Sequence, residues 1–228
     1  IWNRLKTYRA AQGEARIEAL FDNPSRAQDF SAEADGLIFD YSKTMIDEGA
    51  RELLLELARS AEVEARREAM FTGAKINETE GRAVLHTALR NLSGSVTVDG
   101  AEVMDEVRAT HARMSAFARS VRDGSFAGQG GTITDVVNIG IGGSDLGPAM
   151  AALALAPYHD GPRTHFVSNV DGADIADTLK GLDPARTLVI VASKTFTTIE
   201  TMTNAKTARD WMGKAVSDPG AQFVALSS

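Results

Sequence analysis

The sequence predicts an α/β fold in which a parallel sheet with flanking helices follows a mainly helical N-terminal segment. From about residue 131 onward, short apolar runs rich in β-branched residues alternate with helix-like segments. The connections between these segments are short, which is typical of parallel strands joined by right-handed crossovers. Before residue 130, the apolar residues recur mainly at helical spacing instead.

The composition is that of an ordinary globular protein, and it limits the possible functions. The 228 residues are 43% hydrophobic and 24% charged, which is enough for a sizeable core. The formal net charge of −7 argues against a nucleic-acid partner. The chain has no cysteine, and its four histidines show no metal-ligand spacing, so we expect no metal site. No apolar run approaches the roughly 20 residues that span a bilayer. We therefore expect a cytoplasmic protein without a membrane partner.

The first 130 residues are interpreted as a helical N-terminal segment. Helices are expected over residues 2–21 (interrupted at Gly13), 46–58, 61–70, 79–90 (capped by Thr79) and 102–121. Extended pieces are expected at 36–42 and 96–100, the second closed by an Asp-Gly turn. Glycines at 124, 128, 130 and 131 form the clearest break in composition, which predicts a domain boundary between 1–130 and 131–228.

The segment 131–228 is expected to supply the parallel sheet. Strands are predicted at 135–141, 164–170, 187–192 and 222–226, with helices at 145–156, 173–180 and 198–212. Since ligands usually bind at the carboxyl edge of such a sheet, the turns that follow the strands are the places to look for a site.

The first strand runs directly into a glycine-rich turn, which predicts an anion site. Gly142 and Gly143 let the backbone approach a ligand closely, Ser144 adds a hydroxyl, and the N–H groups of the next helix favour an anion. A dinucleotide fingerprint is disfavoured because Asp145 occupies its third glycine position, although Asp171 imitates the ribose-binding acid. No Gly-x-x-x-x-Gly-Lys-Ser/Thr run exists, so a P-loop is unsupported as well.

The third strand ends in the most informative polar run of the chain, which we interpret as a phosphate loop. Hydroxyls at Ser193, Thr195, Thr197 and Thr198 surround the single ammonium group of Lys194. Short donors, one point charge and free helix N–H groups suit a phosphate dianion. The alternative is a threonine-rich helix cap beside a solvated lysine. More hydroxyls are present than capping requires, so we favour the phosphate site.

Three motifs resemble those of the glucose-6-phosphate isomerase (phosphoglucose isomerase) family. They are Gly140-Ile141-Gly142-Gly143-Ser144-Asp145-Leu146-Gly147-Pro148, the run from Asn77 to Arg90, and Ser193-Lys194-Thr195-Phe196-Thr197-Thr198-Ile199-Glu200-Thr201. The resemblance extends from Phe39 to Ser227 and implies that 131–228 is the first sugar-isomerase (SIS) subdomain, incomplete at its C-terminus. It also implies interconversion of glucose 6-phosphate and fructose 6-phosphate through a cis-enediol, without a cofactor, by a homodimer.

The resemblance implies substrate-binding residues but no catalytic ones. By motif match, Ser193, Lys194, Thr195 and Thr198 hold the sugar phosphate, Phe196 and Thr197 complete the loop, and Gly143 and Ser144 face the same substrate. The family's acid/base residues lie in sequence beyond Ser228, so the chain is expected to be an N-terminal portion that is inactive alone. Glu200 is interpreted as a first-turn helix acid.

Two other functions remain open at this stage. One is a non-catalytic SIS-type module that binds sugar phosphates, although residues 1–130 contain no basic recognition helix. The other is an aldose–ketose isomerase that acts on mannose phosphates.

Overall fold

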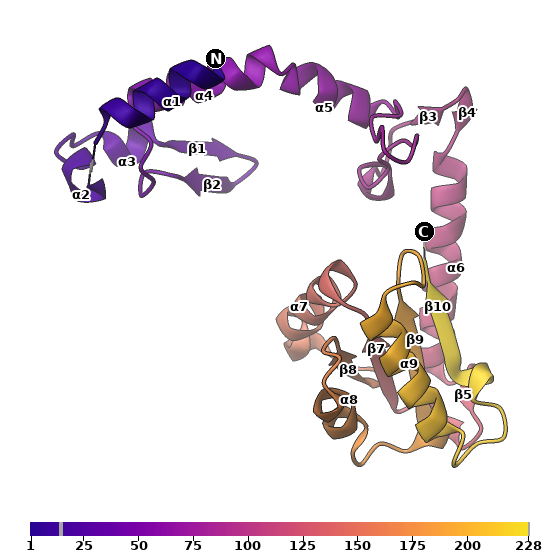
Figure 1. Ribbon diagram of the computed structural model, residues 1–228. Coiled ribbons are helices and arrows are strands. Elements are labelled where there is room, and N and C mark those ends of the chain that lie inside the picture. Colours follow the sequence, from indigo (N-terminus) through magenta and orange to yellow (C-terminus); the bar gives the residue numbers. More distant parts are fainter. Residues whose placement is uncertain (14–15, 228) are drawn as a thin grey trace. The chain divides into compact units, whose positions relative to one another are not determined.

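The computed structural model describes residues 1–13 and 16–227, and the chain divides into two compact units, residues 1–107 and 108–228 (Figure 1). Each unit is described separately below. Among the described residues, no helix has the length and apolar character needed to cross a membrane.

The second unit contains the predicted parallel sheet. Its strands are β7 (Asp135–Ile139), β8 (Arg163–Val167), β9 (Thr187–Ala192) and β10 (Phe223–Leu226). They are hydrogen-bonded in the order β10-β9-β7-β8, and every pair is parallel. All four overlap the ranges expected from sequence, with limits that differ by at most three residues. The α/β fold class is confirmed.

Helices cover both faces of this sheet. The covering helices are α6 (Met104–Asp123), α8 (Gly172–Leu179) and α9 (Ile199–Met212), and a further helix, α7 (Leu146–Ala154), follows β7. The larger core cluster joins β7, β8 and β9 to α8 and α9; its buried members include Val137, Ile139, Val189, Ile175 and Met212. A second cluster, on Leu188 and Val121, packs α6 against the opposite face (Figure 1). Successive residues of β9 therefore pack on opposite faces of the sheet, because side chains alternate along a strand.

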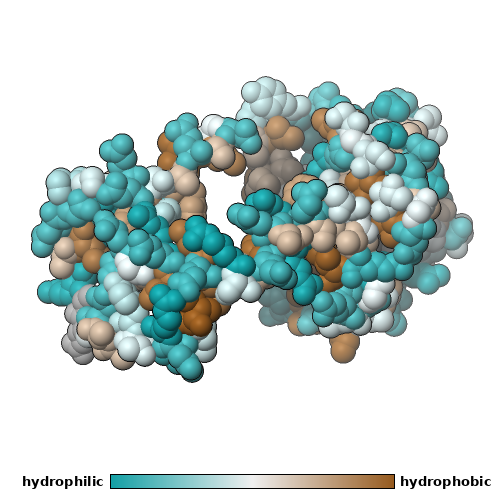
Figure 2. All heavy atoms as spheres, turned by 90° about the horizontal axis from the view of Figure 1, so that it is seen from above, coloured by the Kyte–Doolittle hydropathy of each residue, from teal (hydrophilic) through white to brown (hydrophobic). Residues whose placement is uncertain are grey.

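Not every apolar side chain of this unit is buried. None of the residues of α7 is buried, and Leu146, Met150 and Leu153 are all exposed. Figure 2 shows brown, hydrophobic patches among the largely teal surface of the face that it draws.

The glycine-rich stretch before the sheet is a hairpin formed by β5 (Ala127–Gly128) and β6 (Gly131–Thr132). The buried side chain of Gln222 bonds to it. The Gln222 Oε1 accepts from the Gln129 N–H at 3.0 Å, within the hairpin loop. The Gln222 Nε2 donates to the carbonyls of Pro184 at 2.9 Å and Thr187 at 2.7 Å. These bonds attach the hairpin to the start of β9 and to the turn before β10. The domain boundary near residue 130 stays a prediction.

The first unit consists of short helices and hairpins. Its elements are α1 (Trp2–Ala11), α2 (Ile17–Leu20), α3 (Arg26–Asp29), β1 (Ser31–Ala34), β2 (Leu37–Asp40), α4 (Glu48–Ser60), α5 (Val63–Phe71), η1 (Ala88–Arg90), β3 (Thr97–Val98) and β4 (Ala101–Glu102). Both hairpins turn through an Asp-Gly pair with positive φ at both residues, the conformation that suits a two-residue hairpin loop.

One predicted helix is absent. The spacing of Val84, Leu85, Ala88 and Leu89 predicts a helix over 79–90, but only the 3₁₀ turn η1 forms there. Asn77 pairs with Arg82 through two backbone hydrogen bonds, and Gly81 between them has a φ of +61°. Thr79, the expected cap, donates its hydroxyl to the Asn77 side chain at 2.8 Å. This prediction was wrong because local side-chain hydrogen bonds compete with helix formation.

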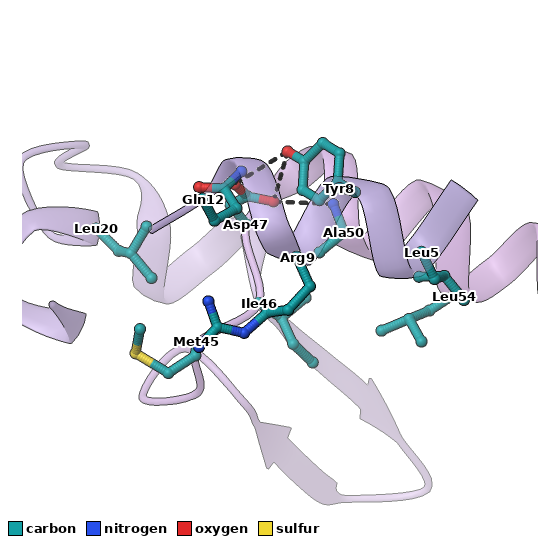
Figure 3. A pocket seen from close by; sticks show the side chains of 10 residues that line it. All are labelled: Leu5, Tyr8, Arg9, Gln12, Leu20, Met45, Ile46, Asp47, Ala50 and Leu54. Atoms are coloured by element: carbon teal, nitrogen blue, oxygen red, sulfur yellow. Dashed lines mark hydrogen bonds between the residues drawn. The ribbon is translucent and has the colours of Figure 1, made fainter. Parts of the chain in front are cut away.

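Two polar centres connect elements within the first 50 residues of the first unit. Asp47 caps α4 by accepting from the Ala50 N–H at 2.8 Å, and it also accepts from Tyr8 of α1 and from Gln12, the residue after that helix (Figure 3). These three side chains line a pocket whose other lining residues are Leu5, Arg9, Leu20, Met45, Ile46, Ala50 and Leu54. Arg26, which is 2% exposed, forms the second centre: it donates to three backbone carbonyls and lies 4.2 Å from the Phe30 ring centroid.

Candidate functional site

The sheet order creates a topological switch point between β7 and β9. These two strands are neighbours, but the chain leaves β7 toward β8 on one side and leaves β9 toward β10 on the other. Because connections diverge at such a point, ligands of open α/β sheets usually bind beyond the carboxyl ends of the two strands. The two sequence motifs that predict an anion site follow these two strands. The fold therefore brings the starts of both motifs to one place.

The glycine turn after β7 is packed tightly at one end and open at the other. A Cβ atom on Gly140 would lie 2.7 Å from the Ser144 Cβ, 2.9 Å from the Ser144 carbonyl oxygen and 3.1 Å from the Ala192 carbonyl oxygen. The last of these contacts shows that the two loops start side by side. At Gly143, in contrast, an added Cβ would meet nothing within 4 Å. The turn thus presents open backbone at Gly143, beside the half-buried Ser144.

A 3₁₀ turn, η2 (Gly142–Ser144), connects this strand to α7. The Ser144 N–H donates to Ile141 at 3.2 Å, and the Asp145 N–H donates to Gly142 at 3.0 Å. Gly142 has a φ of +58°, in the left-handed region that favours glycine. The prediction of a tight turn after this strand is therefore confirmed.

The loop after β9 is shaped by an internal hydrogen bond. Ser193 is 5% exposed, and its Oγ accepts from the Phe196 N–H at 3.1 Å. Phe196 has a φ of +53°, which is uncommon for a residue with a side chain, and it packs against the larger core cluster. The partly buried ring anchors the loop to this cluster, and Lys194, Thr195 and Thr197 are exposed.

The hydroxyls of this loop do not serve as helix caps. Thr198 occupies the N-cap position of α9, but its side chain makes no capping hydrogen bond. The Thr195 and Thr197 hydroxyls lie 2.6 Å apart and bond to each other. This arrangement disfavours the threonine-rich cap as an explanation of the motif. It leaves a hydroxyl-rich, lysine-containing loop at the amino end of a 14-residue helix.

Two contacts at this edge are not apparent from the motifs. The side-chain Nδ2 of Asn138, within β7, donates to the Ser144 carbonyl at 3.0 Å. The Ser227 hydroxyl donates to the Lys194 carbonyl at 2.8 Å. The only sequence signal for the first is a polar residue inside an otherwise apolar run. Nothing in the sequence predicts the second.

Two other acidic residues of the second unit, Glu200 and Asp135, lie outside the two loops. Glu200 lies in the first turn of α9 and is half-buried. Asp135 lies at the amino end of β7, away from the carboxyl edge, and bonds to Arg163 and His165. Burial tends to raise the pKa of Asp135, but hydrogen bonds from Arg163, His165 and Thr134 outweigh it and lower that pKa. Among the described residues, no group of three or more acidic or histidine side chains could hold a metal ion.

Comparison with known proteins identifies relatives along the whole chain. The family profile described as phosphoglucose isomerase matches residues 40–228. The glucose-6-phosphate isomerases of Jannaschia sp. (strain CCS1) and Cereibacter sphaeroides are each 67% identical over 228 residues, the whole of this chain. The crystal structure of a glucose-6-phosphate isomerase from Chlamydia trachomatis matches with a TM-score of 0.73 and 28% identity, covering 94% of this chain and 44% of that one.

The chain is shorter than these relatives, since it spans 42% and 43% of the length of the first two. The profile match covers most of the chain and includes both loops of the candidate site. The chain belongs to the phosphoglucose isomerase family.

Proposed function

We propose that this chain carries the phosphate-binding half of a glucose-6-phosphate isomerase, an enzyme that interconverts glucose 6-phosphate and fructose 6-phosphate. The observation that supports this most directly is the arrangement at the switch point. An exposed lysine and several hydroxyls follow β9, and an open glycine turn follows the adjacent strand β7. The names of the relatives suggest the substrate, and this arrangement of side chains supports the proposal that its phosphate binds here.

In this proposal the phosphate is bound by groups from both loops. Lys194 provides the point charge, and Ser193, Thr195 and Thr198 provide hydroxyl donors, with Phe196 and Thr197 completing the loop. The amino end of α9 adds a favourable dipole. Gly143 and Ser144 approach the same group from β7. Charge-assisted hydrogen bonds of this kind are the stronger ones in proteins.

The bound phosphate takes no part in the chemical step, but it holds the rest of the sugar in place. Binding energy from a nonreacting group supplies orientation for proton transfer elsewhere on the substrate. The acid/base residues are proposed to lie in the part of the full-length enzyme that this chain does not include. We therefore assign no catalytic residue here, and we propose that the complete enzyme is a cytoplasmic homodimer.

Replacing Lys194 by alanine tests the phosphate site. Affinity for inorganic phosphate or glucose 6-phosphate should fall by about 1–3 kcal/mol, the range for a hydrogen bond to a charged group. Isothermal titration calorimetry on the 228-residue chain measures the change. Lys206→Ala is the matched control, because Lys206 is an exposed lysine of α9 that pairs with Asp210 one turn later. Equal affinity in the wild type and the Lys194 variant removes this lysine from the site.

A second test concerns the chemical step. The 228-residue chain should show no isomerase turnover, because a phosphate site without a positioned base cannot move the C2 proton. A coupled assay with fructose 6-phosphate measures this. Turnover that is abolished by Glu200→Gln would overturn the proposal and make Glu200 the base.

A further inference from the structure

A buried amide within β7 is unexpected in a strand of the sheet interior. Asn138 lies between Val137 and Ile139, both fully buried, and is itself 8% exposed. Burying an amide costs free energy unless its polar atoms find partners. The Asn138 Nδ2 donates to the Ser144 carbonyl at 3.0 Å. The strand therefore keeps a polar side chain where an aliphatic one would pack, and the partner of that side chain is the glycine turn.

The Ser144 carbonyl needs this donor because α7 cannot supply one. The carbonyl of the following residue, Asp145, accepts the first regular bond of the helix, from the Ala149 N–H at 2.9 Å. The Ser144 carbonyl would accept from the N–H of the residue four positions later, but that residue is Pro148, which has no N–H. The helix therefore cannot extend back to bind the Ser144 carbonyl. The amide of Asn138 occupies the place of the missing N–H.

This bond connects the rigid centre of the sheet to the turn that faces the proposed phosphate. The close contact between Gly140 and Ser144 constrains the turn from the strand side. The Asn138 bond restrains the peptide that joins Ser144 to Asp145, and it therefore limits the backbone conformations open to Ser144 and to the adjoining Gly143. We infer that Asn138 is a positioning residue, which acts through Ser144 to hold the glycine turn ready for a phosphate group. The inference rests on the proposed function and extends it to a residue that does not contact the substrate.

Two variants of Asn138 test the inference. Asn138→Asp keeps the shape of the side chain and replaces the donor by an acceptor. Asn138→Leu also removes the donor but suits a buried strand, so it keeps the fold even if the buried charge of the first variant does not. The matched control is Asn204→Asp. Asn204 is 2% exposed and donates to a backbone carbonyl, that of Asn169, at 2.8 Å, but in a different loop.

The measurements separate positioning from general stability. Backbone ¹⁵N relaxation of the 228-residue chain should show that Gly142–Ser144 are more mobile than in the wild type in both Asn138 variants. In the control variant, the mobility of these residues should equal that of the wild type. Titration with inorganic phosphate should give a dissociation constant raised about three- to tenfold, as expected from the loss of one hydrogen bond. Thermal unfolding should show that Asn138→Leu is at least as stable as the control.

The outcomes are distinct. Unchanged mobility at Gly142–Ser144 in Asn138→Leu overturns the inference, whether or not phosphate binds. Unchanged phosphate affinity in that variant overturns it as well. Absence of phosphate binding in the wild type instead refutes the proposed function, and the relaxation data still decide whether Asn138 holds the turn.

Discussion

Gly140 lies at the start of the glycine turn, beside the end of β9, so replacing it with alanine tests the packing of the proposed site. The new methyl group would meet three atoms at 2.7–3.1 Å: the Ser144 Cβ and carbonyl oxygen, and the Ala192 carbonyl oxygen. None of these is the end of a flexible side chain, so the backbone itself must move. The φ of Gly140 is not in the left-handed region, so contact alone accounts for the effect. We expect a loss of about 1–3 kcal/mol, as for an overpacked core.

Gly143→Ala is the matched comparison within the same turn. A methyl group there meets nothing within 4 Å, and the φ is again ordinary, so the free energy of unfolding should change by less than about 1 kcal/mol. If the phosphate approaches the Gly143 backbone, the same methyl group should weaken phosphate binding. Gly140→Ala should therefore mainly lower the stability, whereas Gly143→Ala should mainly lower the affinity for phosphate.

Urea unfolding at pH 7 and calorimetric titration with inorganic phosphate measure both quantities. A Gly140→Ala protein that unfolds at the wild-type urea concentration would refute the description of a turn packed against β7 and β9. A Gly143→Ala protein as destabilised as Gly140→Ala would refute the open backbone at that position.

Three further predictions concern buried polar groups. Asp135→Asn should lower stability at pH 7 by about 1–3 kcal/mol. Since folding lowers the pKa of Asp135 below its ordinary 3.8, its stabilising effect is complete above about pH 4 and is lost as the pH falls through the folded pKa. The variant should therefore lose less stability on acidification in urea unfolding at pH 7 and pH 3, and parallel losses would contradict this. Arg26→Lys should cost about 1–3 kcal/mol, because one ammonium group cannot both reach three carbonyls and stack on Phe30; an unchanged melting temperature would contradict it. Gln222→Leu leaves two carbonyls without their donor, so we expect about 1–3 kcal/mol of destabilisation and faster amide exchange at Gln129; protection equal to the wild type would refute that role.

The elements with strong local patterns were predictable from sequence. The four strands are short, apolar and rich in β-branched residues, and each is bounded by a turn or helix signal, so their limits were found to within about three residues. The hairpin strands β1, β4, β5 and β6 were missed, because strands of two to four residues carry little periodicity. The false helix at 79–90 shows the opposite failure: its apolar spacing is helical, but Asn77 closes a tighter turn.

The site was predictable in its residue types but not in its assembly. The hydroxyl-lysine run and the glycine run are visible in the sequence, and each suggests an anion. Their proximity depends on β9 lying beside β7, and the order of strands in a sheet is a tertiary property that the sequence pattern does not contain. The Asn138 contact was missed for the same reason, since a single amide in a strand does not indicate its partner. The substrate-binding roles themselves stay a prediction.

One measurement tests most directly whether the two loops bind a single phosphate. Glucose 6-phosphate is titrated into the ¹⁵N-labelled 228-residue chain, and the amide signals of both loops are followed. We predict that the signals of Gly143–Ser144 and of Thr195–Thr198 shift together and fit one dissociation constant. Shifts confined to one loop, or two different constants, would contradict the shared site.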